Sequence, residues 1–98
     1  MFSDNSKNIL SLLGTRLRAE RLARNEPQAR FAARLGVSVP TLRRLEQGDA
    51  GAQIGHWLAA LEVLGRLPDV EALLAPRYSL FDAAVEAPKA RQRARRLK

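Results

Sequence analysis

Few side chains in this sequence could carry covalent or metal chemistry. Its 98 residues contain no cysteine and a single histidine, His56, which excludes thiol nucleophiles, disulfides and metal sites that need several Cys or His ligands. It has no glycine-rich phosphate loop and no carboxylate pair in an obvious pocket, so no set of residues meets the requirements of an active site. The sequence therefore predicts a protein that is not an enzyme and uses no metal and no cofactor.

The arginines are distributed unevenly. The chain holds 17 Lys and Arg against 10 Asp and Glu, a net charge of +7, and three of the 17 are lysines. Residues 16–44 hold eight arginines and two glutamates, and residues 88–98 hold six basic residues and no acid, whereas residues 45–87 hold two arginines and seven acids. Two basic blocks separated by an acidic one indicate two faces with different partners, and a polyanion is the natural partner of the basic blocks.

An all-α fold is expected to position these charges, because apolar residues recur at helical spacing and strand patterns are nearly absent. We expect five helices. The first two span about 8–24 and 27–35, and the third begins at 37–38 and ends before a loop at 48–51. The fourth and fifth span 53–64 and 70–74. Ser38 and Asp69 are expected to cap helices, and Asn25, Gly36 and Gly65 to end them. The residues expected to face inward are Ile9, Leu10, Leu13, Leu17, Leu22, Phe31, Ala32, Leu35, Leu42, Leu45, Ile54, Trp57, Leu58, Leu61 and Leu64.

Four segments follow from this pattern: an N-terminal tail at 1–6, a five-helix domain at 7–76, a C-terminal extension at 77–87 and a flexible basic tail at 88–98. The extension is predicted to form a short helix from about 79 to 86, with an extended segment at 78–81 as the alternative. The N-terminus has no apolar targeting segment and no run is long enough to cross a membrane. We expect a soluble protein of the cytoplasm, associated with the nucleoid and not with a membrane.

A Gly-Val-Ser turn at residues 36–38 separates the second and third helices, which must then cross at a steep angle. The run Gln-Ala-Arg-Phe-Ala-Ala-Arg-Leu-Gly-Val-Ser-Val-Pro-Thr-Leu-Arg-Arg-Leu-Glu-Gln-Gly at residues 28–48 resembles the helix-turn-helix of the XRE family, of phage Cro and repressor type. The resemblance extends over about residues 13–64. It implies a compact, repressor-like DNA-binding domain. Glu26 and Pro27 depart from the apolar residue and Thr or Ser cap usual in this family, and Glu26 is a negative charge near the expected DNA surface.

The third helix is expected to read DNA. Its Leu42 and Leu45 should point inward, which leaves its other face for the major groove. Arg44 can hold a guanine through two hydrogen bonds, whereas Val39 and Pro40 can read only shape or thymine methyls, or pack on the turn. The base-reading residues that the resemblance implies are Val39, Pro40, Thr41, Arg43 and Arg44.

The resemblance also implies phosphate contacts and a structural ion pair. Gln28 and Gln47 are the phosphate contacts by family position, and further contacts are expected from Arg30, Arg34 and Ser38 on the same surface. Arg21 and Glu46 are expected to form a salt bridge that ties the first helix to the end of the third. The cations of the tail could follow phosphates, bind a partner or keep the chain in solution; they are Lys89, Arg91, Arg93, Arg95, Arg96 and Lys98.

These features predict a sequence-specific transcriptional repressor that binds a palindromic operator in double-stranded DNA as a homodimer. The dimer surface is expected in the acidic, apolar region 57–85. The Leu-Gly-Arg-Leu-Pro join at 64–68, a Leu-Phe-Asp segment and the Arg-rich end resemble HipB-like antitoxins, which implies autoregulation and a HipA-like kinase toxin as partner. A repressor without a toxin is equally open. The remaining alternative is a protein-interaction module whose Arg-rich tail binds RNA or an acidic partner.

Overall fold

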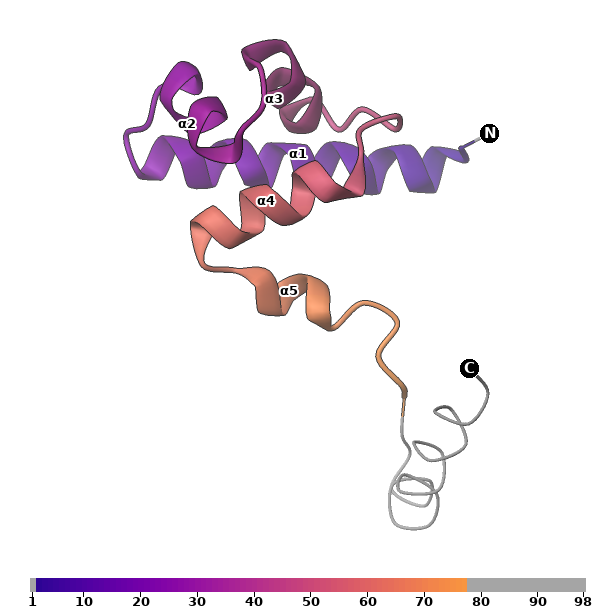
Figure 1. Ribbon diagram of the computed structural model, residues 1–98. Helices are drawn as coiled ribbons and strands as arrows, with labels where there is room; N and C mark the ends of the chain where they lie inside the picture. The colour runs from indigo at the N-terminus through magenta and orange to yellow at the C-terminus, as the bar shows by residue number, and fades with distance from the viewer. Residues whose placement is uncertain (1, 78–98) are drawn as a thin grey trace.

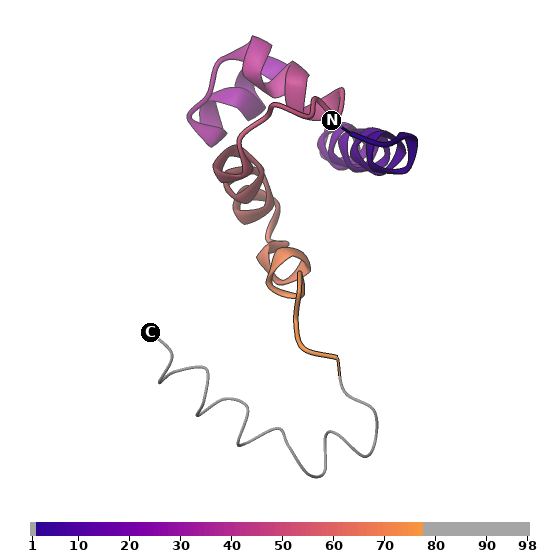
Figure 2. The ribbon, with the colours of Figure 1, turned by 90° about the vertical axis from the view of Figure 1, so that its right-hand side faces the viewer.

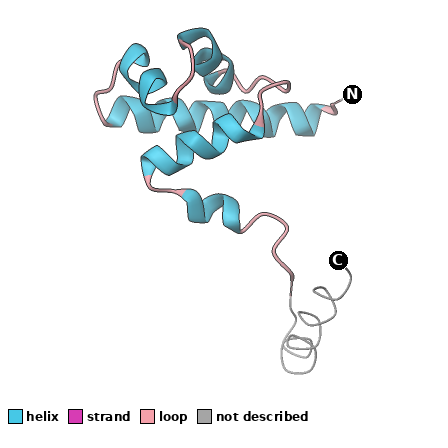
Figure 3. Ribbon diagram, in the orientation of Figure 1, coloured by secondary structure: helices cyan, strands magenta, loops and turns pink. Residues whose placement is uncertain are grey.

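The computed structural model describes residues 2–77, so the expectations for residues 78–98 lie outside the described part of the chain. Within residues 2–77 every regular element is a helix (Figures 1 and 3). α1 packs against α3, α2 packs against α3 and α4, and α4 packs against α5. The predicted all-α fold is confirmed, and α2 and α3 form the helix-turn-helix. The five helices are α1 (Asp4–Ala23), α2 (Gln28–Leu35), α3 (Val39–Glu46), α4 (Ile54–Leu64) and α5 (Leu67–Glu71).

Capping residues set most of the helix boundaries. Ser38 caps α3, because its side-chain oxygen accepts a hydrogen bond of 3.2 Å from the backbone N–H of Thr41. Gly36 and Gly65 end α2 and α4 in the left-handed conformation, which glycine adopts at little cost. Asn25 follows α1 with a φ of 56°. These four residues act as the sequence predicted.

Two helix boundaries differ from the prediction. α1 begins at Asp4 instead of about residue 8, because Ser3 accepts a hydrogen bond from the backbone N–H of Ser6 and extends the helix toward the N-terminus. α5 spans Leu67–Glu71 instead of 70–74, and Asp69 lies in its first turn instead of capping it. Pro68 explains the earlier start, since proline is favoured in the first turn of a helix.

The core lies where α1, α2, α3 and α4 meet. Phe31, Leu42 and Leu45 are fully buried in it. Val39 and Trp57 are half-buried against it, and His56 is half-buried. The other buried hydrophobic residues are Leu17, Ala32, Leu35, Ala60 and Leu64.

The inward orientation predicted for five apolar residues is wrong. Ile9, Leu13, Leu22, Ile54 and Leu58 are exposed. Helical spacing identifies one face of a helix, but α1 is long and only part of that face lies against α3. The described residues therefore leave several apolar side chains in contact with water.

Two glycines let α1 and the end of α3 approach closely. A Cβ atom on Gly14 would collide with the backbone of Glu46 and Gly48, and one on Gly48 would collide with the backbone of Leu10. Because backbone atoms cannot rotate out of the way as a flexible side chain can, a larger residue at either position must push the two elements apart. Within the described residues no helix is both long and apolar enough to cross a membrane.

Candidate nucleic-acid interface

The outer face of α3 is open to water. α2 and α3 lie at one end of the molecule, and α4 and α5 lead away from them (Figure 2). Leu42 and Leu45 fix the inner face of α3 in the core. The outer residues predicted for DNA recognition are therefore presented at the surface, and the exposed ones are Pro40, Arg43, Arg44 and Gln47.

A buried ion pair holds the end of α3 against α1. The Nε of Arg21 lies 2.6 Å from one carboxylate oxygen of Glu46, and its Nη2 donates to the other at 3.1 Å. A third nitrogen of Arg21 donates to the backbone carbonyl of Glu26 at 2.9 Å. The side chains of Arg21 and Glu46 are 6% and 4% exposed. Bidentate pairing of this kind fixes both position and orientation, so α3 has one defined placement on α1.

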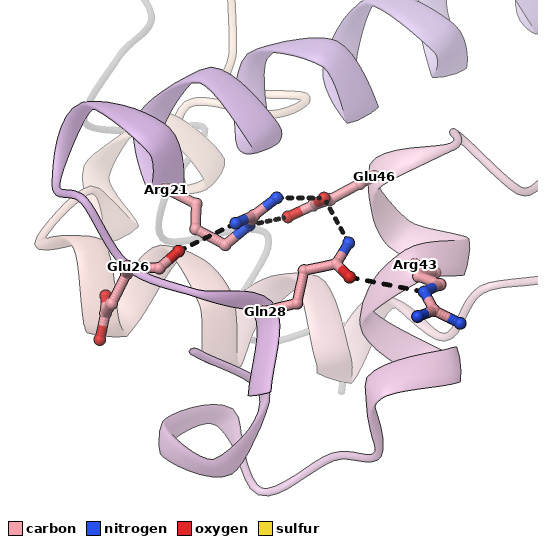
Figure 4. Close-up of polar contacts among 5 residues, drawn as sticks. All are labelled: Arg21, Glu26, Gln28, Arg43 and Glu46. Carbon is pink, nitrogen blue, oxygen red and sulfur yellow. Dashed lines mark hydrogen bonds and ion pairs between the residues drawn. The ribbon is translucent and has the colours of Figure 1, made fainter. Parts of the chain in front are cut away.

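Gln28 connects this buried pair to the surface of α3 (Figure 4). Its Nε2 donates to Glu46 and its Oε1 accepts from the Nε of Arg43, each at 3.4 Å. Both hydrogen bonds are long and therefore weak. The chain of contacts runs from α1 through the end of α3 and the first residue of α2 to an exposed arginine. Gln28 thus restricts the orientation of the Arg43 guanidinium.

Glu26 does not present a free negative charge to a ligand. It is buried, and one of its carboxylate oxygens lies 2.5 Å from Nη1 of Arg34. The other oxygen has no hydrogen-bond partner among the described residues. Arg34, predicted as a phosphate contact, is half-exposed, but its guanidinium is paired with Glu26. The carboxylate expected to weaken a nearby phosphate contact is therefore neutralised.

Three other arginines of the helix-turn-helix lack such neutralisation among the described residues. Arg30, Arg43 and Arg44 are exposed, and none of them forms an ion pair with a residue in the range 2–77. By contrast, Arg24 pairs with Glu20, and Arg66 pairs with both Glu20 and Asp69. We call the exposed Arg30, Arg43 and Arg44 of α2 and α3 the arginine face. Exposed cations that have no acidic partner among residues 2–77 favour the binding of a polyanion.

Three predicted contact residues take part in local structure. The Ser38 and Thr41 hydroxyl groups lie 3.0 Å apart, and the Thr41 hydroxyl accepts from Arg44 at 3.4 Å. Val39 is half-buried against the core. Ser38 and Thr41 are therefore involved in capping α3, and Val39 contributes to its packing. Within residues 2–77, the Arg44 guanidinium makes this one hydrogen bond to a side chain.

Sequence reasoning expected the Arg21–Glu46 pair, which the structure contains, but it missed the close backbone approach at Gly14 and Gly48 and the burial of Glu26. A signal existed for the first: Gly14 interrupts a strongly helical pattern, where an isolated glycine costs about 1 kcal/mol relative to alanine. No local pattern marks Glu26, because its partner Arg34 is one of several nearby arginines. The predicted tail contacts at 89–98 lie outside the described residues.

No metal site competes with this interpretation in the described range, since residues 2–77 bring together no group of three His, Cys, Asp or Glu side chains that could hold an ion. Residues 12–74, nearly two thirds of the chain, match the family model described as "Helix-turn-helix domain". The matched range includes α2, the turn, α3, α4 and α5 in full. No curated protein and no solved structure matches the chain.

Proposed function

The chain belongs to the helix-turn-helix domain family, a family of DNA-binding regulators, and from this premise we propose that it is a transcriptional repressor. In this proposal two copies bind an inverted-repeat operator, with α3 of each copy in the major groove. The function is exercised in the cytoplasm, at the nucleoid, and requires no catalytic step.

One observation carries the proposal most strongly. Arg43 and Arg44, which pair with no acid among residues 2–77, lie on the outer face of α3. Leu42 and Leu45 on the inner face are fully buried, and the end of the helix is held by a buried ion pair. A rigid helix with free guanidinium groups can place hydrogen-bond donors at base edges without first ordering itself. A protein that used this domain solely to bind another protein would not need these arginines and Gln28 together.

The contacts divide into two kinds. Arg44 reads a guanine through its O6 and N7 atoms, and Pro40 with the half-buried Val39 contacts thymine methyls or responds to groove shape. Gln28, Arg30 and Gln47 bind phosphates and set the register of the protein on the duplex. Arg43 lies between the base-reading and the phosphate-binding residues. Direct base contacts are then few, so DNA deformability supplies part of the specificity.

A dimer follows from the small size of one reading helix. Two-fold pairing of half-sites about one helical turn apart would double the contacts and produce a palindromic operator. Exposed Leu58 on α4 and Leu67 on α5 lie away from the arginine face. We place the dimer surface there.

The test is selection of bound duplexes from a random pool at about 0.15 M salt, the physiological ionic strength. A symmetric site with a guanine in each half supports the repressor and Arg44 as its reader. No enrichment over random DNA would contradict the proposal and favour the interaction module, with the Arg-rich tail bound to RNA or an acidic partner. An enriched site without symmetry would contradict the dimer alone.

We extend the proposal to an autoregulating antitoxin with a HipA-like kinase toxin as partner, on the basis of the resemblance at residues 64–68 and in the Arg-rich end. Co-expression with the product of a neighbouring kinase gene tests this extension. A stable complex that still binds the selected operator supports it. Absence of a neighbouring kinase gene, or of a complex with its product, would leave a repressor that acts without a toxin.

A further inference from the structure

An apolar groove opens between α1, α4 and α5, away from the arginine face. Its volume is about 480 Å³, within the range of pockets that enclose a ligand of several side chains' size. Trp57 and Leu61 of α4 lie in its wall, together with Leu13 of α1 and Leu73 beyond α5. The groove therefore shares α1 and α4 with the core and extends from them to α5.

Several wall residues are exposed to a degree unusual for their type. Ile54 is 65% exposed, Leu73 is 62% exposed and Leu13 is 40% exposed. Single exposed apolar residues are ordinary, but a contiguous set lining a concavity marks a surface that something covers. Leu74, next to the wall, has a fully exposed side chain and a φ of 58°, which is uncommon for a residue other than glycine.

We infer that residues 78–86 of the same chain cover this groove. The segment reads Tyr-Ser-Leu-Phe-Asp-Ala-Ala-Val-Glu, and Leu80 with Ala84 and Phe81 with Val85 recur at a spacing of four. Such spacing produces one apolar face if the segment is helical. The inference concerns a face distinct from the proposed DNA surface and stands independently of it.

Chain length permits this placement. Leu73 is already part of the wall, and seven residues separate it from Leu80, a span of at most about 25 Å for an extended chain. The basic tail at 88–98 is a poor occupant, since Leu97 is its one large apolar residue.

Tethering favours the chain's own segment over a second copy. A segment joined to the groove by a short linker has an effective concentration in the millimolar range. A second copy at micromolar concentration would have to bind far more tightly to displace it. The groove should therefore be covered in the monomer and at every dilution.

Cross-linking of the full chain tests the inference directly, because the protein has no native cysteine. Ile54→Cys combined with Leu80→Cys, treated with a short bifunctional maleimide, should give a cross-link within one chain. The matched control is Arg30→Cys with Leu80→Cys, since Arg30 lies on α2, which does not line the groove. Equal yields from the two pairs would overturn the inference, as would a cross-link that joins two chains.

The single tryptophan provides a second readout in full-length protein. Leu80→Ser with Phe81→Ser should shift the Trp57 emission to longer wavelength and roughly double its acrylamide quenching constant, because the indole regains contact with water. Asp82→Asn with Ala83→Ser is the control and should leave both unchanged. In the unmodified protein neither quantity should vary with dilution; a dependence on concentration would identify a second copy as the occupant. Unchanged fluorescence in the Leu80 and Phe81 variant would show that the segment does not cover the groove.

Discussion

The arginine face of α2 and α3 and the groove between α1, α4 and α5 are built in opposite ways. Behind the arginine face Leu42 and Leu45 are completely buried, and its three arginines form no ion pair within residues 2–77. At the groove the apolar side chains are open to water, whereas Arg66 at its edge pairs with Glu20 and Asp69. The first surface thus offers exposed guanidinium groups over a packed interior, whereas the second offers large apolar side chains that no described residue covers.

This difference indicates which kind of ligand each surface lacks. Uncompensated arginines favour a polyanion, and an uncovered apolar groove favours an apolar segment. The arginine face and the groove have no residue in common, so the two kinds of ligand would not compete for the same side chains.

The largest expected effect comes from breaking the ion pair that supports the arginine face. Arg21→Ala leaves Glu46 charged and buried, so the free energy of unfolding should fall by about 3–5 kcal/mol. Arg24→Ala removes a partly exposed pair with Glu20 and a hydrogen bond to the backbone carbonyl of Leu64, and should cost about 1 kcal/mol. Urea unfolding of both variants measures the difference. Equal losses would show that the buried pair does not hold α3 on α1.

Gly14 tests the close approach of α1 to the end of α3. Gly14→Ala forces a Cβ into backbone atoms of Glu46 and Gly48, so stability should fall by about 1–3 kcal/mol despite the higher helix propensity of alanine. Gly55 lies in the first turn of α4 with open space around it. Gly55→Ala should therefore stabilise by about 0.4–1 kcal/mol. Thermal or urea unfolding distinguishes these opposite signs, and a stabilising Gly14→Ala would refute the close contact.

Arg44 tests whether the arginine face reads bases. Arg44→Ala should lose about 1–3 kcal/mol of discrimination at one position in each half-site, measured by competition between the selected operator and single-base variants. Arg66→Ala serves as the control because that guanidinium is neutralised away from α3. It should leave the preference unchanged. Identical preferences in all three proteins would remove Arg44 from base reading.

The smallest expected effect concerns the basic tail. Replacing Arg93, Arg95 and Arg96 with glutamine should weaken binding to all duplexes about equally and lower the log–log salt slope by up to about 3. Titrations at several salt concentrations measure this slope. An unchanged slope would assign the tail to a protein partner.

Much of the helix-turn-helix was predictable because local rules determine it. Ser38 as a cap, Gly36 as a helix end and the Leu42–Leu45 pair as the inner face each follow from residue type and spacing. The exposure of Ile9 and Ile54 was not predictable in this way. Periodicity shows which side of a helix is apolar, but not whether another element lies against that side.

The burial of Glu26 has a similar origin. A carboxylate in the sequence carries no sign that a particular arginine will neutralise it, since Arg34 lies eight positions away and Arg24 and Arg30 are nearer in the chain. The start of α5 depends on Pro68, which lies in the first turn of the helix. With Asp69 as the cap instead, the same sequence predicts a later start. Burial and pairing therefore required the three-dimensional arrangement.

The central claim, that the arginine face binds DNA and the groove does not, can be tested by one measurement. Amide chemical shifts of the full chain are recorded by NMR before and after addition of the selected operator duplex. The account predicts that the large chemical-shift changes fall within residues 28–47. The amide shifts of Leu61, Val70 and Leu73 in the groove should remain unchanged. Chemical-shift changes centred on the groove, or the absence of such changes in α3, would contradict it.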